Sequence, residues 1–402
     1  MPYDPSAIRE LAPLAASRAA HARAARAKLI VGLREFWAAG FDTARWEAEL
    51  APLYASEDGN AGSLAKFAGG HGSINQIMTP GVEPQAYALL ACDGSQIMPD
   101  RHGSAIFAMI QAACVCVVYG DRPTPRDKAL EEAMAGALKR TTMLYGEDEL
   151  IEHGELVSAG SISTERDLRE IELLAENCAR LTAAGVRVVA LADGSLMPFA
   201  LLNDKLALPE AMRHADRMTR ALNTLRGCNA IVAGYVDRPN SNTLVKSLAL
   251  GMRGAADAQR TLAAVETLFD RQVVEGVLAP NQRTAMFDPG WNTRGIRRIA
   301  DGGHALLACY ANMSRNPQKP YVARIELPHW CADDLPALHA LLQRHARASI
   351  GDPYPFCLKA AHENAVITKE DQREIQQSVE RELMKHGIMP VTSAKQAAKD
   401  LR

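Results

Sequence analysis

The sequence lacks the features that mark membrane and secreted proteins. None of its apolar runs reaches the roughly 18 residues that a membrane-spanning helix needs. The N-terminus, MPYDPSAIRE, has no basic stretch followed by an apolar one, which is the pattern of a secretory signal peptide. These absences predict a cytoplasmic protein without a membrane partner.

Cysteine patterns typical of zinc sites and disulfide frameworks are also absent. The eight cysteines form no CxxC pair and no zinc-finger spacing, and most of them lie inside apolar runs. We therefore expect reduced, buried thiols, which are the usual state of cysteine in the cytosol.

An excess of basic charge is missing as well. The 45 Lys and Arg residues and the 47 Asp and Glu residues leave a formal net charge of -2. The overall charge therefore gives no sign of a nucleic-acid-binding protein. A site for a polyanion would have to be a local basic patch or a metal centre.

Two common catalytic motifs are missing too. Ser95 and Ser195 are not part of a GxSxG nucleophile elbow, which argues against a serine hydrolase. The glycine-rich segment 69–73, GGHGS, lacks the Lys-Ser or Lys-Thr of a phosphate-binding loop, so no nucleotide-hydrolysing site is predicted.

The composition and patterning are those of a large globular α/β protein. The chain has 402 residues, of which 48% are hydrophobic and 23% are charged. We predict an N-terminal helical segment over 1–55 and a Gly-, Ser- and Asn-rich linker over 56–85. A catalytic domain over 86–378 and a C-terminal tail over 379–402 follow.

Within 86–378, predicted strands alternate with predicted helices. The strands are expected at 86–92, 104–119 (one long strand or a pair), 186–192, 229–236, 304–313 and 321–327. The helices are expected at 123–138, 163–183, 209–225, 241–251, 334–347 and from 355 to about 386. This alternation favours an α/β fold with a mixed central sheet flanked by helices.

Asp-Gly-Ser occurs twice, each time after an apolar run that reads as a buried strand. The first copy is in LLACDGSQIM (89–98) and the second in LADGSLMPF (191–199). A single copy would be an ordinary strand-to-turn junction. If Asp93 and Asp193 end neighbouring strands, their carboxylates converge, and two close carboxylates stay ionised only beside a positive charge. Mg²⁺ or Mn²⁺ would supply that charge, because both ions prefer oxygen ligands.

The helix before the second copy offers candidates for a third carboxylate, namely Glu165, Asp167, Glu170, Glu172 and Glu176. Glu172 and Glu176 are four residues apart and share one face of this helix. Glu172 lies 21 positions before Asp193, which leaves room for three helical turns, a glycine turn and one strand. The resulting order of strand Asp, helix Glu and strand Asp is that of ribonuclease-H-like nucleases.

Five segments of the chain resemble the NurA family, whose members are DNA end-processing nucleases with a ribonuclease-H-like core. The segments are ACDGSQIMPDRHG (91–103), RDLREIELLAE (166–176), VVALADGSLM (188–197), NSNTLVKSLA (240–249) and DPYPFCLKAAHENAVIT (352–368). They span about two thirds of the chain. The last is the most specific, because His362 follows Tyr354 by eight residues.

The resemblance implies a manganese- or magnesium-dependent nuclease. Family members act in DNA end resection or defence, usually as a homodimer beside a hexameric HerA-type ATPase. Asp93, Asp193 and His362 correspond to motif positions of the family, and the resemblance implies that they are metal ligands. Glu172 is our choice for the helix glutamate, with Glu176 as the alternative. The motif's tyrosine and lysine correspond to Tyr354 and Lys246.

In a two-metal nuclease, carboxylates hold two ions about 4 Å apart across the scissile phosphate. We expect Asp93 to bridge the ions, Asp193 and Glu172 to complete the carboxylate set, and His362 to bind an ion or orient the attacking water. Lys246 would neutralise charge that builds on the phosphate. Two alternatives stay open, namely a catalytically silent DNA- or ATPase-binding subunit and an RNA-directed nuclease.

The N-terminal segment is the first candidate for the ATPase-docking surface. It carries apolar residues that we expect to be exposed, because the catalytic core does not obviously need this segment. These residues are Leu29, Ile30, Leu33, Phe36 and Trp37.

Overall fold

The structure is a computed structural model. In it the chain forms two compact units. It describes residues 5–40, 43–54, 63–67, 75–101, 103, 105–120, 128–137, 140–152, 155–202 and 206–389. The predicted linker therefore lies partly outside the described residues, as do the GGHGS segment, the start of the helix predicted at 123–138 and most of the predicted tail. One unit comprises residues 1–79, 237–291 and 307–324, and the other comprises the remaining residues.

Hydrogen bonds order nine strands as β1-β9-β10-β11-β8-β7-β2-β3-β4. The boundary between the two units runs through β11 (Val322–Pro328). The predicted α/β class with a mixed, helix-flanked sheet is confirmed. We describe each unit by itself.

The unit that carries both Asp-Gly-Ser motifs is built on five long strands. These strands are β2 (Tyr87–Ile97), β3 (Ala108–Tyr119), β4 (Arg140–Tyr145), β7 (Val188–Asp193) and β8 (Ile231–Asp237). β2 pairs parallel with β7 and antiparallel with β3, so it lies in the middle of this part of the sheet. Its apolar first half is fully buried, as expected for a strand covered on both faces.

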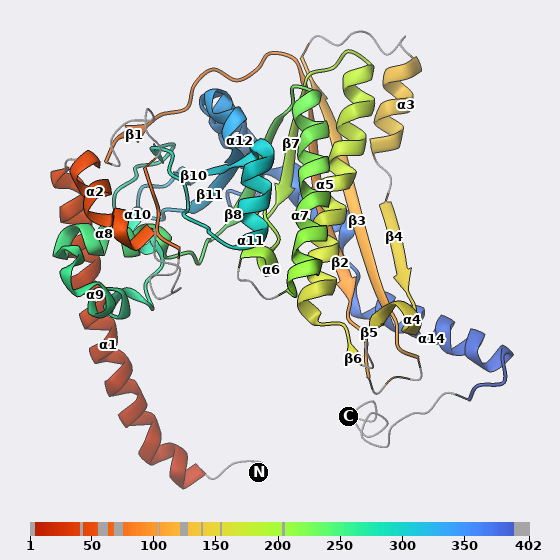
Figure 1. The fold of residues 1–402 in the computed structure, drawn as a ribbon, viewed down its shortest axis with the longest axis horizontal. Coiled ribbons are helices and arrows are strands. Elements are labelled where there is room, and N and C mark those ends of the chain that lie inside the picture. Colours follow the sequence, from red (N-terminus) through yellow and green to blue (C-terminus); the bar gives the residue numbers. More distant parts are fainter. Residues whose placement is uncertain are drawn as a thin grey trace. The chain divides into compact units, whose positions relative to one another are not determined.

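Helices cover both faces of this sheet. On one face, α5 (Ala159–Ala183) packs against β2 and β3, and α7 (Leu208–Gly227) lies beside α5 (Figure 1). On the other face, α13 (Phe356–Ala365) also contacts β2 and β3. The other helices of this unit are α3 (Lys128–Ala137), α4 (Glu147–Leu150), α6 (Phe199–Leu202), α11 (Arg294–Ile299), α12 (Leu335–Ala348) and α14 (Lys369–Lys385). A small hairpin of β5 (Ile151–Glu152) and β6 (Glu155–Leu156) precedes α5.

The structure refines two of the predicted elements. The helical region expected from 355 to about 386 is two helices, α13 and α14. The apolar run predicted over 104–119 as one long strand or a pair is a single strand, β3, within the described residues. The following strand, β4, was not predicted. Its residues alternate between exposed and half-buried, so it lacks the apolar run of its neighbours.

The unit that carries the N-terminus has its own hydrophobic core. Its elements are α1 (Pro5–Ala39), α2 (Thr43–Tyr54), β1 (Ile77–Met78), α8 (Thr243–Arg253), α9 (Ala258–Val265), α10 (Asp270–Val274), β9 (Arg283–Thr284) and β10 (Leu306–Asn312). The C-terminal part of α1 packs with α2, α8 and α10 in this core.

The expectation that the N-terminal apolar residues are exposed is wrong. Leu33 and Trp37 are 0% and 1% exposed, and Leu29, Ile30 and Phe36 are partly buried against the same core. The exposed apolar residues of α1 are Ile8, Leu11, Leu14 and Val31. The end of α1 is therefore part of a folded core.

Candidate metal centre

Asp93, Asp193 and His362 come together from three elements that lie far apart in the sequence. β2 and β7 are parallel neighbours with Cys92 level with Ala192, so the following aspartates emerge at the same edge of the sheet. His362 lies on α13. Each of the three residues offers one ligand atom, and these atoms all lie within 4.8 Å of one another.

The two oxygens of Asp93 have different partners. Oδ1 accepts a hydrogen bond of 2.8 Å from the backbone N–H of Gly94, and Oδ2 lies 2.7 Å from Nδ1 of His362. The side chain of Asp93 is 13% exposed, whereas that of His362 is 59% exposed. The aspartate is therefore fixed from inside the fold, while the histidine faces solvent.

Tyr354 holds the second aspartate. Its hydroxyl donates a hydrogen bond to Oδ1 of Asp193, and its ring packs edge-on against Tyr235 at 5.4 Å between centroids. Burial raises the pKa of Tyr354, and the negative charge of Asp193 raises it further. Tyr354 therefore stays protonated at neutral pH and acts as a fixed hydrogen-bond donor.

Glu172 is not one of the residues that the structure brings together here. Both of its carboxylate oxygens accept hydrogen bonds from Arg217 of α7, at 2.9 and 3.1 Å. The alternative, Glu176, accepts a hydrogen bond of 2.8 Å from Arg169. Glu172 is therefore in an ion pair with α7 and Glu176 in one within α5, and the metal-binding role expected of either glutamate stays a prediction.

Glu170 is the α5 glutamate whose charge interacts with both aspartates. It is 6% exposed, and burial raises its pKa well above the usual value. Asp167 raises that pKa further, Arg166 lowers it, and Asp93 and Asp193 add smaller upward effects. The sequence analysis counted Glu170 among the carboxylates of this helix but preferred Glu172, although Leu173 and Leu174, three and four residues after Glu170, mark its side of the helix as buried.

The glycine and serine of the first motif serve two different helices. A Cβ at position 94 would lie 2.5 Å from Oε1 of Glu170 and 2.8 Å from Cγ of Arg166, so only glycine lets α5 approach β2 here. Ser95 faces the opposite side of the sheet, because successive side chains of a strand alternate. Its hydroxyl donates a hydrogen bond of 2.5 Å to the carbonyl of Ala365 at the end of α13.

The second motif has a turn glycine and a structural serine. Gly194 has a φ of +102°, a conformation that L side chains rarely adopt. The hydroxyl of Ser195 donates to Oε2 of Glu326 at 2.8 Å, and the N–H of Leu196 donates to the same oxygen at 3.0 Å. The hydroxyls of both motif serines are thus engaged in hydrogen bonds that connect distant parts of the chain.

Lys246 lies on α8, in the unit that carries the N-terminus. Burial lowers its pKa, and the negative charges of Asp270 and Glu266 partly oppose that effect. Its expected role beside a phosphate stays a prediction.

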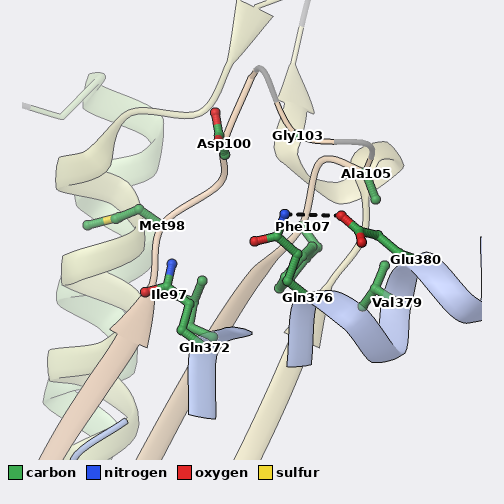
Figure 2. Close-up of a pocket in the computed structure, with 10 residues that line it drawn as sticks. All are labelled: Ile97, Met98, Asp100, Gly103, Ala105, Phe107, Gln372, Gln376, Val379 and Glu380. Carbon is green, nitrogen blue, oxygen red and sulfur yellow. Dashed lines mark hydrogen bonds between the residues drawn. The ribbon is translucent and has the colours of Figure 1, made fainter. Parts of the chain in front are cut away.

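One hollow of the unit that carries both Asp-Gly-Ser motifs lies apart from the residues of the metal centre. Figure 2 shows it between the segment after β2 and α14, lined among others by Met98, Asp100 and Gln376. Nε2 of Gln376 donates a hydrogen bond of 3.1 Å to Oε1 of Glu380 there. No residue expected at the metal centre lines this hollow.

The three clustered residues have the chemistry of a divalent cation site. Two carboxylates and an imidazole suit Mn²⁺ or Mg²⁺ better than a soft metal. Burial is the main cause of the raised pKa of Glu170, and the negative charges of Asp167, Asp93 and Asp193 raise it further against the opposing effect of Arg166. A bound divalent cation would offset these negative charges, so the residues present fit the metal.

Two aspartates on neighbouring parallel strands of a mixed sheet and a histidine on a covering helix form a carboxylate-centred site. Residues 87–367 match the family model described as the NurA domain. The match covers more than half of the chain, so the chain belongs to the NurA family, a family of nucleases that implies use of a divalent metal. No curated protein was found that matches the chain. Among the described residues, no helix has both the length and the apolar character needed to cross a membrane.

Proposed function

We propose that this protein is a metal-dependent DNA nuclease that hydrolyses phosphodiester bonds. Asp93, Asp193 and His362 would form its active site. The observation that carries the proposal is the convergence of their ligand atoms within 4.8 Å, in a chain of a nuclease family. We further propose that Glu170, in place of Glu172, is the helix carboxylate of this site. DNA end processing or defence would be the setting.

The residues of the proposed site would share the work of holding the ion and positioning the phosphate. Asp93 would hold a divalent ion, and the Gly94 N–H fixes its carboxylate. Asp193 would hold the ion as well, and the hydroxyl of Tyr354 orients its carboxylate. His362 would bind an ion or orient the attacking water. Lys246 would neutralise charge on the phosphate.

Mn²⁺ or Mg²⁺ bound here would supply the acidified water nucleophile and stabilise the leaving oxygen. The protein contributes orientation around these ions. Tyr354 keeps its proton on the hydroxyl and so cannot serve as the base. The half-exposed ring of His362 is the group of this site that solvent and a DNA strand can reach.

A nuclease assay with matched variants tests the proposal. End-labelled DNA should be cleaved with Mn²⁺ and stay intact with EDTA. Asp93→Asn and Asp193→Asn should each reduce cleavage at least about a hundredfold, because each removes a charged ligand of the cation. Asp301→Asn removes a carboxylate from an exposed residue and should leave cleavage unchanged.

Two outcomes would contradict the proposal. One is full activity in Asp93→Asn or Asp193→Asn. The other is no cleavage by the wild-type chain with either ion, alone or with the neighbouring ATPase, which would favour a catalytically silent subunit.

We also propose a homodimer that acts with a hexameric HerA-type ATPase, a partnership supported by family membership. The exposed apolar residues Ile8, Leu11 and Leu14 of α1 replace the buried ones as candidates for a docking surface. A cytoplasmic location is supported by the eight cysteines, which are all free thiols.

A further inference from the structure

Arg166 lies among the carboxylates beside the proposed metal centre. Its Nε is 3.2 Å from Oε1 of Glu170 and 3.1 Å from Oδ1 of Asp167. The side chain of Arg166 is 31% exposed and that of Glu170 only 7%. A partly accessible cation therefore covers a buried carboxylate.

The pKa values show how strongly these charges interact. Burial acts to lower the pKa of Arg166, but Asp167, Glu170 and Asp93 together raise it. Burial disfavours the charged form of Glu170, and so do Asp167 and the two motif aspartates. Arg166 favours the charged form. Arg166 is thus a counter-charge that the protein itself supplies.

The position of Arg166 depends on the glycine of the first motif. A Cβ at position 94 would lie 2.8 Å from Cγ of Arg166. The side chain of Arg166 therefore lies directly over β2 at position 94, which follows Asp93. A divalent ion that recruits Glu170 must compete with the guanidinium group for the same carboxylate.

We infer that Arg166 is an internal counter-cation that holds Glu170 in the metal-free protein and is displaced from it when a divalent cation binds. The inference rests on the proposed function, because it assumes that Glu170 serves the metal. It assigns Arg166 the role of setting metal affinity. An arginine this close to the ligands weakens binding by repulsion and by occupying a ligand, while it stabilises the protein without metal.

Mn²⁺ titration of the full chain by calorimetry tests the inference. Arg166→Gln should bind Mn²⁺ about tenfold more tightly than the wild type, because one neighbouring positive charge is lost. Arg166→Lys retains the charge and should stay near the wild-type affinity. Arg169→Gln is the matched control, since Arg169 pairs with Glu172 and Glu176 on the same helix. Its affinity should not change.

Thermal unfolding gives a second result that a merely structural arginine would not produce. Arg166→Gln should melt at a lower temperature than the wild type in EDTA, and saturating Mn²⁺ should raise its melting temperature by more. Equal stabilisation of the two proteins by Mn²⁺ would overturn the inference.

A measurement on the wild-type chain covers the case in which Arg166→Gln does not fold. The side-chain Nε–H resonance of Arg166, identified by its absence in Arg166→Lys, should shift on saturation with diamagnetic Mg²⁺. An unchanged resonance in a protein that binds Mg²⁺ would overturn the inference alone. A wild-type chain that binds neither ion, or binds equally well as Asp93→Asn, would overturn the proposed function instead.

Discussion

Three consecutive residues of β2 hold three different parts of the proposed centre. Asp93 faces α13 and meets His362, Gly94 leaves space for Glu170 and Arg166 of α5, and Ser95 again faces α13. This division follows from the alternation of side chains along a strand. The motif therefore fixes two helices on opposite faces of one sheet.

Ser95 and Gln111 should position His362. They are paired across β2 and β3, and both donate hydrogen bonds to the carbonyl of Ala365, at 2.5 and 2.8 Å. Replacing them together, Ser95→Ala with Gln111→Leu, should release the end of α13 and lower kcat about tenfold to a hundredfold with little change in KM, because misplaced groups lose orientation.

Steady-state kinetics and circular dichroism check this prediction together. Ser95→Thr keeps the hydroxyl and should retain most of the activity, whereas a merely structural loss would also lower the melting temperature of the double variant severely. Wild-type kcat in the double variant would show that the hydrogen bonds to Ala365 do not position the histidine.

Among the elements, the sequence predicts best the strands that are built mainly from apolar residues. β2, β7, β8, β10 and β11 are apolar because they are buried, and their positions follow from composition. β4 was missed because its residues are alternately exposed. The pairing of strands is non-local, so the sequence alone suggested that the two aspartates converge but could not fix their distance.

The glutamate on α5 shows why site residues are harder to predict than strands. Glu170 and Glu172 differ by two positions, which turns a side chain by about 200° around a helix. Glu170 is on the buried side with Leu173 and Leu174, whereas Glu172 faces Arg217 of α7. Motif order pointed to the helix, and the packing of α5 against β2 and α7 is the reason why we propose Glu170 rather than Glu172.

The packing of α12 against β2 and β3 should make stability depend on pH through His345. Its ring stacks on Phe356 at 5.0 Å and meets Tyr119 edge-on at 5.1 Å, and Nδ1 is buried without a hydrogen-bond partner. Burial lowers the pKa of His345 to about 4, Glu83 raises it and Arg344 lowers it.

Because unfolded histidine titrates near pH 6.5, only the unfolded chain takes up this proton between pH 6.5 and 4. His345 should therefore cost about 1.4 kcal/mol of unfolding free energy for each pH unit lost in that window. Urea unfolding at pH 7 and pH 5 should show a smaller loss for His345→Gln than for the wild type. His386→Gln alters an exposed histidine and should behave like the wild type, and equal losses in all three proteins would refute the prediction.

Seen as a whole, the molecule has an N-terminal helix with two different parts. The last part of α1 belongs to a core with α2 and α8, whereas residues 8–25 are exposed. Removing the whole N-terminal segment would therefore unfold one unit rather than test a docking surface. Substitution of the exposed apolar residues keeps the core intact, since Leu33 and Trp37 are unchanged.

Leu11→Glu with Leu14→Glu should weaken binding to the proposed HerA-type ATPase about tenfold or more while nuclease activity of the isolated chain stays at the wild-type level. These leucines are 58% and 48% exposed, so their replacement costs the fold little, and charged residues would oppose burial in an interface. Val31→Glu is the control within α1, since Val31 is also 50% exposed but lies in the part of the helix that packs on the core.

Co-purification and calorimetry measure ATPase binding, and light scattering at micromolar concentration measures the dimer. If the double variant binds the ATPase as tightly as the wild type, the exposed part of α1 is not the docking surface. If the variant turns from dimer to monomer and binding is lost with it, the same residues serve self-association, and the ATPase recognises the dimer rather than α1 itself.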